Sequence, residues 1–177
     1  MSAPRPILVA GIGNIFFGDD AFGSEVARKL QRMVWPGHIR IEDFGIRSYD
    51  LAYALMDGVD ALFIDITPRG GEPGTLYVME LEMPEPGDGN EMPDGHSMNP
   101  VRVLQMVQSQ GGKAGRLFLL GCEPARVDFE EDAMGLSEPV QAAVPLAIRK
   151  VESLVNDLLA GKIPMEGREP AALKEVS

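Results

Sequence analysis

The sequence contains few of the residues that build local metal, redox or disulfide sites. Its 177 residues include one cysteine, Cys122, and two histidines, His38 and His96. A single cysteine excludes an internal disulfide framework and every zinc-finger or iron–sulfur ligand pattern. Any metal chemistry in this chain therefore has to use carboxylates.

Positive charge is also scarce. Lysine and arginine number 16 against 27 aspartate and glutamate residues, which gives a formal net charge of −11. Nucleic-acid binding needs a cationic surface to neutralise phosphates, and anionic lipid repels an acidic one. We therefore expect no nucleic-acid partner, whereas cations or a basic protein segment can be attracted.

Long hydrophobic runs are absent. No apolar stretch approaches the roughly 20 residues that a membrane span requires. The N-terminal run from Ile7 to Ala10 leads directly into glycines, unlike the longer apolar region and cleavage site of a signal peptide. We expect no membrane insertion and a cytoplasmic location.

Strand-like and helix-like segments alternate along the chain. Buried or alternating apolar patterns predict strands at 6–12, 38–44, 60–66, 75–81 and 116–121. Amphipathic periodicity predicts helices at about 20–35, 48–57, 99–110 and 137–159, with a loop over 83–98. Pro145 implies a kink or break near residue 141 of the last helix.

This alternation favours a single three-layer α/β/α domain. We expect an open, mostly parallel sheet, with the 75–81 strand antiparallel to its neighbour. The domain is expected to span residues 1–160, followed by a flexible tail over 161–177, which is polar and lacks periodicity. In such a fold ligands bind beyond the carboxyl ends of the strands.

The first strand–helix junction, from Gly11 to Gly23, does not match a phosphate loop. Phe16 stands where the dinucleotide fingerprint needs a third glycine. Asp19 and Asp20 stand where a phosphate loop needs Lys and Ser or Thr, and carboxylates at a helix N-terminus repel phosphate. The two aspartates can be a capping pair or part of a site, and both interpretations stay open.

Two more polar side chains follow strands, and one histidine lies in a loop. Asp65 and Asp43 end the 60–66 and 38–44 strands, and His96 lies before the 99–110 helix, whereas His38 starts a strand at the opposite end of the sheet. Asp20, Asp65 and His96 together would suit a divalent ion such as nickel or zinc, with one coordination position left open. The alternatives remain that Asp20 and Asp65 only cap the helix and the turn that follow them, and that His96 is a solvated side chain.

Cys122 offers a different chemistry. It follows the 116–121 strand, so a nucleophile pair with His96 is conceivable. A free cysteine is otherwise commonly a small buried hydrophobe. No Gly-x-Ser-x-Gly elbow occurs, which disfavours a serine hydrolase of that fold.

Several landmarks occur in a fixed order along the chain. They are Ile-Leu-Val-Ala-Gly-Ile-Gly-Asn at 7–14 with acidic residues at 19–20, Asp65, Pro-Gly-Thr at 73–75, His96, Gly-Cys-Glu-Pro at 121–124, and Gly-Leu-Ser at 135–137. From Ile7 to about Leu159 the chain thereby resembles the nickel-iron hydrogenase maturation endopeptidases.

The resemblance implies both a reaction and a site. The reaction is removal of a C-terminal extension from the hydrogenase large-subunit precursor after nickel insertion, with the substrate's nickel recognised by Asp20, Asp65 and His96. Zinc or cadmium could occupy the same site, and Asp19 or Asp43 could serve as the base. A non-catalytic nickel-dependent checkpoint or chaperone, and a small-molecule enzyme using Cys122, are the alternatives.

The chain departs from the family pattern at two places. The family often has Glu at the position of Asp20, and Asp reaches one methylene less far. Where the family has Asp-Gly-Gly-Thr, this chain has Asp-Phe-Gly-Ile at 43–46, so the shape of that turn does not follow from the resemblance.

Overall fold

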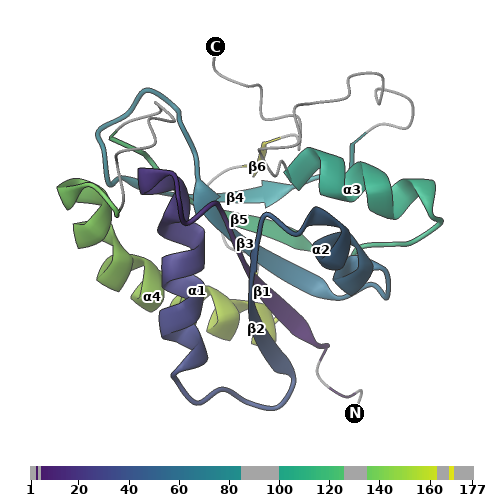
Figure 1. Cartoon of the computed structure of the whole chain (residues 1–177). Helices are drawn as coiled ribbons and strands as arrows, with labels where there is room; N and C mark the ends of the chain where they lie inside the picture. Colours follow the sequence, from purple (N-terminus) through teal and green to yellow (C-terminus); the bar gives the residue numbers. More distant parts are fainter. Residues whose placement is uncertain (1–2, 4, 85–99, 126–134, 163–167, 170–177) are drawn as a thin grey trace.

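The fold alternates strands and helices, and the computed structural model describes residues 3, 5–84, 100–125, 135–162 and 168–169 (Figure 1). The strands are β1 (Ile7–Ile12), β2 (Ile39–Gly45), β3 (Asp60–Ile66), β4 (Leu76–Leu81), β5 (Leu117–Cys122) and β6 (Arg168–Glu169). The helices are a 3-10 turn η1 (Gly18–Ala21), α1 (Phe22–Gln31), α2 (Ser48–Leu55), α3 (Pro100–Ser109) and α4 (Glu138–Leu159).

The strands form one mixed sheet in the order β2-β1-β3-β5-β4-β6. The strands β2, β1, β3 and β5 run parallel, and β4 is antiparallel to β5, with Tyr77 opposite Gly121. The predicted fold class is therefore confirmed, including its one antiparallel strand. Two residues of the expected tail, 168 and 169, pair in parallel with β4; the domain boundary at 160 stays a prediction.

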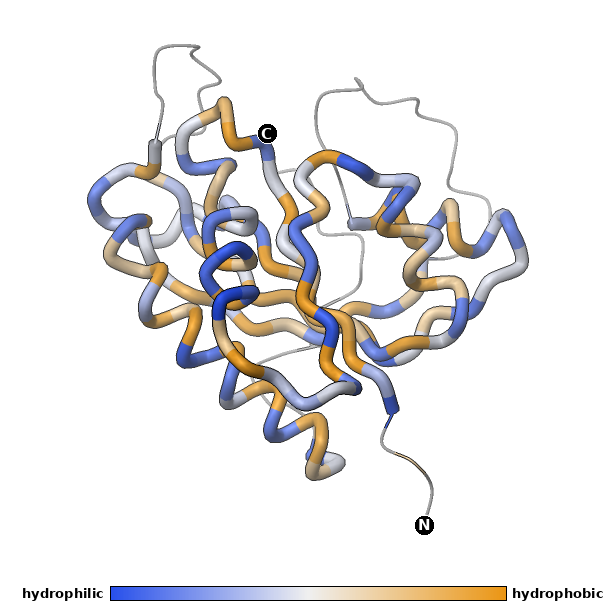
Figure 2. The backbone as a smooth tube through the Cα atoms, turned by 60° about the horizontal axis from the view of Figure 1, so that its bottom comes forward, coloured by the Kyte–Doolittle hydropathy of each residue, from blue (hydrophilic) through white to orange (hydrophobic). Residues whose placement is uncertain are grey.

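Helices cover both faces of the sheet, as a buried parallel sheet requires (Figure 1). Hydrophobic residues recur along the strands at the centre of the fold (Figure 2). Successive strand residues point to opposite faces, so each of the strands β1 to β5 contributes to two apolar cores. The core under α1 and α4 includes Val9, Val26, Leu62, Phe118 and Val144. The core under α2 and α3 includes Leu8, Leu51, Phe63, Leu104 and Leu119.

Helix α1 ends at Gln31, so the prediction that it continues to residue 35 was wrong at its C-terminal end. The indole N–H of Trp35 donates to the carbonyl oxygen of Leu30 at 2.9 Å. The same carbonyl also accepts the N–H of Met33 at 3.0 Å, so the indole and the backbone together close the C-terminal end of the helix. Val34 is consequently fully exposed.

Helix α4 runs as one helix through Pro145, so it does not break near residue 141; the kink that was the alternative stays a prediction. Pro145 lies on the exposed side of the helix, between the buried residues Val144 and Ala147. Water can therefore bond the carbonyl of Gln141 that the proline ring cannot serve.

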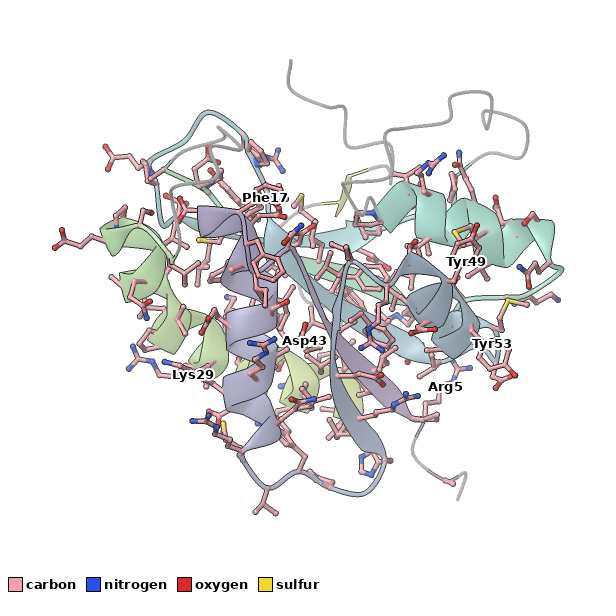
Figure 3. All side chains as sticks on the ribbon, in the orientation of Figure 1. Arg5, Phe17, Lys29, Asp43, Tyr49 and Tyr53 are labelled. Carbon is pink, nitrogen blue, oxygen red and sulfur yellow. The ribbon has the colours of Figure 1, made fainter. Side chains whose placement is uncertain are left out.

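The carboxyl ends of β1, β2, β3 and β5 meet at one edge of the sheet. Phe17, after β1, lies at this edge, and Arg5, before β1, lies at the opposite one (Figure 3). In the part of the chain that the structure describes, no helix combines the length and apolarity needed to cross a bilayer.

Candidate functional site

Asp20 and Asp65 are neighbouring carboxylates at the carboxyl edge of the sheet. Asp20 lies in η1 and Asp65 near the end of β3, and both residues are half-buried. Burial raises the pKa of Asp20 above its ordinary value. Burial, and then the nearby charge of Asp20, raise the pKa of Asp65 well above its ordinary value. Two partly desolvated carboxylates that repel each other attract a cation.

Backbone donors orient both carboxylates. The N–H of Asn14 donates to Oδ2 of Asp20 at 2.9 Å, and the N–H of Ile66 donates to Oδ1 of Asp65 at 2.8 Å. Each bond favours the charged form and partly opposes the effect of burial on the pKa. These bonds use Oδ2 of Asp20 and Oδ1 of Asp65, so the other oxygen of each carboxylate is available to bind a metal ion.

Gly13 allows β1 to pass directly against η1. Its φ is +146°, and a Cβ placed there would overlap the carbonyl oxygen of Asp20. The N–H of Gly13 donates to the carbonyl of Gly45 at 3.0 Å, which ties this turn to the end of β2. The glycine therefore fixes the path of the chain toward Asp20, as expected for a glycine that shapes a turn.

The raised pKa of Asp65 predicts a pH-dependent stability. In the unfolded chain this carboxyl ionises near its ordinary value of 3.8, whereas in the folded protein it stays protonated to higher pH. The unfolded state therefore loses its proton first, and the free energy of unfolding falls as pH rises above 3.8 toward the raised value.

Asp65→Asn removes this contribution to the free energy of unfolding. We expect wild type to lose stability relative to the variant as pH rises above 3.8, measured by urea unfolding without metal. A difference between the two proteins that stays constant as pH rises above 3.8 would contradict the raised pKa of Asp65.

His96 lies outside the described residues, so the structure does not place the third predicted ligand. Within 5–84, 100–125 and 135–162, no group of three His, Cys, Asp or Glu side chains could hold a metal ion. His38 lies just before β2, and its carbonyl accepts the N–H of Ile7 at the start of β1. It is therefore at the opposite edge, as predicted.

Asp19 is buried, with 4% of its surface exposed. Its carboxylate accepts the N–H of Ala125 at 2.9 Å, and the N–H and hydroxyl of Ser137 at 2.7 and 2.9 Å. Asp19 and Asp20 thus have different partners although they are adjacent in sequence. The base role expected for Asp19 stays a prediction, and its contacts favour a structural role.

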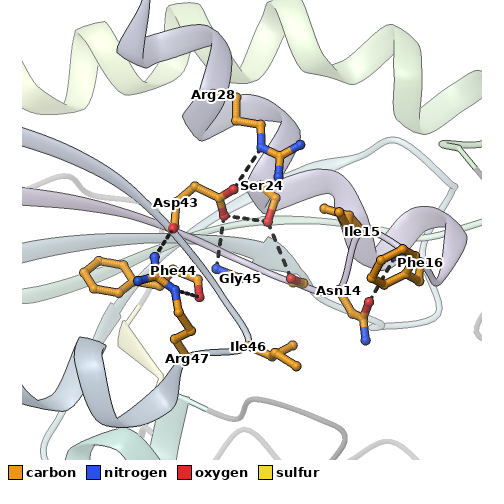
Figure 4. A pocket seen from close by; sticks show the side chains of 11 residues that line it. Asn14, Ile15, Phe16, Ser24, Arg28, Asp43, Phe44, Gly45, Ile46 and Arg47 are labelled. Atoms are coloured by element: carbon orange, nitrogen blue, oxygen red, sulfur yellow. Dashed lines mark hydrogen bonds and ion pairs between the residues drawn. The ribbon is translucent and has the colours of Figure 1, made fainter.

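Asp43 lines a pocket of about 370 Å³ beyond the ends of β1 and β2 (Figure 4). Its carboxylate accepts the Ser24 hydroxyl at 2.7 Å, the Arg28 Nε–H at 3.0 Å and the Gly45 N–H at 3.0 Å. The base role expected for Asp43 likewise stays a prediction.

Part of the lining of this pocket is apolar and exposed. Ile15, Phe16 and Ile46 line the pocket and are exposed, Phe16 to 62%. Asn14 also lines the pocket while its N–H bonds Asp20. A polypeptide seated in the pocket would therefore lie next to Asp20.

Cys122 is a buried free thiol. Burial, followed by the charges of Asp19 and Glu123, raises its pKa to about 12. Nucleophilic attack needs the thiolate, so the structure disfavours the interpretation of Cys122 as a nucleophile.

The buried thiol should resist alkylation in the folded protein. We expect iodoacetamide to label Cys122 at least ~100-fold more slowly in native protein than in urea, because both access and thiolate are lacking. Mass spectrometry of the intact chain measures both rates. Comparable native and denatured rates would show an accessible, activated thiol.

Glu123 is a structural residue that the sequence interpretation missed. It is buried, and its carboxylate accepts the Arg69 and Gly70 N–H groups and the Tyr77 hydroxyl, with shortest distances of 2.8, 3.0 and 2.9 Å. These bonds hold the segment between β3 and β4 against the end of β5. An acidic residue directly after a buried strand was the available signal.

The sequence and the fold of this chain are both similar to those of hydrogenase maturation proteases. A family profile described as hydrogenase maturation protease matches residues 24–154. The hydrogenase expression/formation protein HupD of Rhizobium leguminosarum is 31% identical over 171 residues, which cover 96% of this chain and 82% of the relative. That match spans nearly the whole chain and so includes the segment around Asp20, which precedes the profile match.

Two further similar proteins are described as hydrogenase 2 maturation proteases or peptidases. The hydrogenase 2 maturation protease of Escherichia coli is 27% identical, over 90% of this chain and 96% of the relative. The crystal structure of a hydrogenase 2 maturation peptidase from a Thaumarchaeota archaeon is 28% identical with a TM-score of 0.64, over 86% of this chain and 99% of that one. The similarity therefore extends over most of both chains in each comparison.

Proposed function

This chain belongs to the hydrogenase maturation protease family, and we propose that it removes the C-terminal extension of a nickel-iron hydrogenase large-subunit precursor after nickel insertion. The observation that carries the proposal is the pair formed by Asp20 and Asp65 at the carboxyl edge of the sheet. Membership of a protease family favours cleavage over the non-catalytic checkpoint or chaperone.

The carboxylate pair suits recognition of a cation that belongs to the substrate. Asp20 and Asp65 are half-buried and repel each other, so a divalent ion relieves both the desolvation and the repulsion. We assign His96 as the third ligand on the family resemblance. The donor set of two carboxylates and one imidazole accommodates nickel, and also zinc or cadmium.

The chain's own residues then hold the substrate beside the metal. The pocket around Asp43 receives the polypeptide next to the cleaved bond, and its lining residue Asn14 connects it to Asp20. Bound nickel supplies polarisation of the scissile carbonyl or activation of water. Since the oxygens of Asp19 and Asp43 already accept hydrogen bonds from the protein, we propose that these two aspartates mainly maintain the geometry of the site.

Incubation of the purified protein with a nickel-loaded large-subunit precursor tests the proposal. We expect a shortened large subunit, with the released C-terminal peptide identified by mass spectrometry, and no cleavage of the nickel-free precursor. A stable complex without shortening would instead support the checkpoint. A cytoplasmic location belongs to the same proposal and is tested by cell fractionation.

A further inference from the structure

Two consecutive carboxylates of η1 are held by different parts of the molecule. Asp20 bonds the N–H of Asn14 and affects the pKa of Asp65. Asp19 is buried and bonds Ala125 and Ser137, which lie 106 and 118 positions further along the chain. The proposed function uses Asp20 as a metal ligand and gives Asp19 only a general part in keeping the site in shape, so the question is what Asp19 holds.

Asp19 binds both ends of the segment that connects β5 with α4. Ala125 lies three residues after β5, and Ser137 is the residue before α4. The hydroxyl of Ser137 makes no capping bond to its own helix and instead donates to Oδ2 of Asp19 at 2.9 Å. One carboxylate therefore ties β5 and α4 to η1.

Besides α1, which follows it directly, and the bond from the Asn14 N–H to Asp20, the contacts of Asp19 tie the turn η1 to the rest of the described structure. It is four residues long, and its N-cap residue Phe17 makes no side-chain capping bond. A single 3-10 turn is too short to be stable from its own hydrogen bonds. Hydrogen bonds to a carboxylate are stronger than hydrogen bonds to a neutral acceptor. The buried bonds to Asp19 are therefore a principal restraint on the turn that carries Asp20.

We propose that Asp19 is a positioning residue: its carboxylate anchors η1 to the segment between β5 and α4, so that the carboxylate of Asp20 keeps its place beside Asp65. Residues that orient a metal ligand typically affect metal affinity or activity by about 10- to 100-fold. The effect on cleavage rests on the proposed function, whereas the effect on the geometry of Asp20 does not.

The amide of Asn14 reports the position of Asp20 without any metal or substrate, because it donates to Oδ2 of Asp20. In Asp19→Ala we expect this amide to exchange with deuterium about 10-fold faster, relative to the amide of Leu62 in the sheet core. Ser137→Ala, which removes only the hydroxyl donor to Asp19, should accelerate the same amide less. Exchange is measured by NMR on the full chain.

Asp60→Ala is the matched control. Asp60 is also buried, and its Oδ1 accepts the N–H of Arg116 at 2.7 Å, but it lies at the amino end of β3. Its loss should lower stability without changing the exchange of Asn14 relative to Leu62. If the Asn14 amide keeps its wild-type exchange in both Asp19→Ala and Ser137→Ala, the positioning role is overturned.

Cleavage kinetics provide the second measurement. In Asp19→Ala we expect kcat to fall about 10- to 100-fold with an unchanged KM for the precursor, whereas Asp60→Ala keeps the wild-type kcat at a temperature where it is folded. Wild-type kcat in folded Asp19→Ala would overturn the proposal. If wild type itself does not cleave, the proposed function fails while the Asn14 exchange still decides the role of Asp19.

Discussion

Asp20→Asn and Asp65→Asn are each expected to reduce precursor cleavage by ~100-fold or more while the protein stays folded. Asparagine keeps the size of the side chain but removes the charge that binds a cation. Neither change should destabilise the fold, because burial already disfavours the ionised form of both groups. His96→Ala should have the same effect on cleavage, on the assignment of His96 as the third ligand. Initial rates on nickel-loaded precursor measure the loss, and circular dichroism checks the fold.

Asp50→Asn is the control for the loss of a carboxylate as such. Asp50 lies in the first turn of α2, its side chain is 58% exposed, and it forms a surface ion pair with Arg47. Surface pairs of this kind contribute little, so cleavage and stability should both stay at the wild-type level. Wild-type cleavage in all three ligand variants would remove the proposed site altogether.

Gly23→Val is expected to prevent folding or to destabilise the domain by more than ~3 kcal/mol. Gly23 lies in the first turn of α1, where the helix crosses directly over β1 and β3. A Cβ at this position would overlap the backbone carbonyl oxygens of both Ile12 and Ile64. Backbone cannot move aside as a flexible side chain can, so α1 would have to lift from the sheet.

Urea unfolding, together with the yield of soluble protein, measures this effect. Gly37→Ala is the matched control, since a Cβ there meets nothing within 4 Å. Its effect should stay within about 0.5 kcal/mol. A Gly23→Val protein that unfolds at the wild-type urea concentration would contradict the close packing of α1 on the sheet.

The strands were predictable because each is a short apolar segment bounded by turn residues. That pattern also located Asp65, since an acidic residue at the end of a buried strand must face either the next turn or the crevice. The end of α1 was not predictable, because the apolar periodicity extends to Val34, beyond the point where the backbone and the Trp35 indole bond the Leu30 carbonyl and end the helix. The sequence could not tell whether α4 would break at Pro145, because it does not show that this proline lies on the exposed side of the helix.

The sequence could not predict that Asp19 and Asp20 have different hydrogen-bond partners. Two adjacent identical residues carry no signal of which one faces Ala125 and Ser137 and which one faces Asn14. Those partners are fixed by long-range packing of β5 and α4 against η1. The buried Glu123 poses the same difficulty, because its partners at Arg69, Gly70 and Tyr77 lie more than 40 positions away.

The repulsion between Asp20 and Asp65 also has a consequence for fidelity. Specificity is a difference between two affinities, and each 1.4 kcal/mol of that difference is about a tenfold preference. On the proposed function, a precursor that lacks nickel leaves two partly desolvated like charges facing each other, whereas a loaded precursor neutralises them. The same carboxylate pair thereby favours binding of the nickel-loaded precursor and disfavours binding of the nickel-free one.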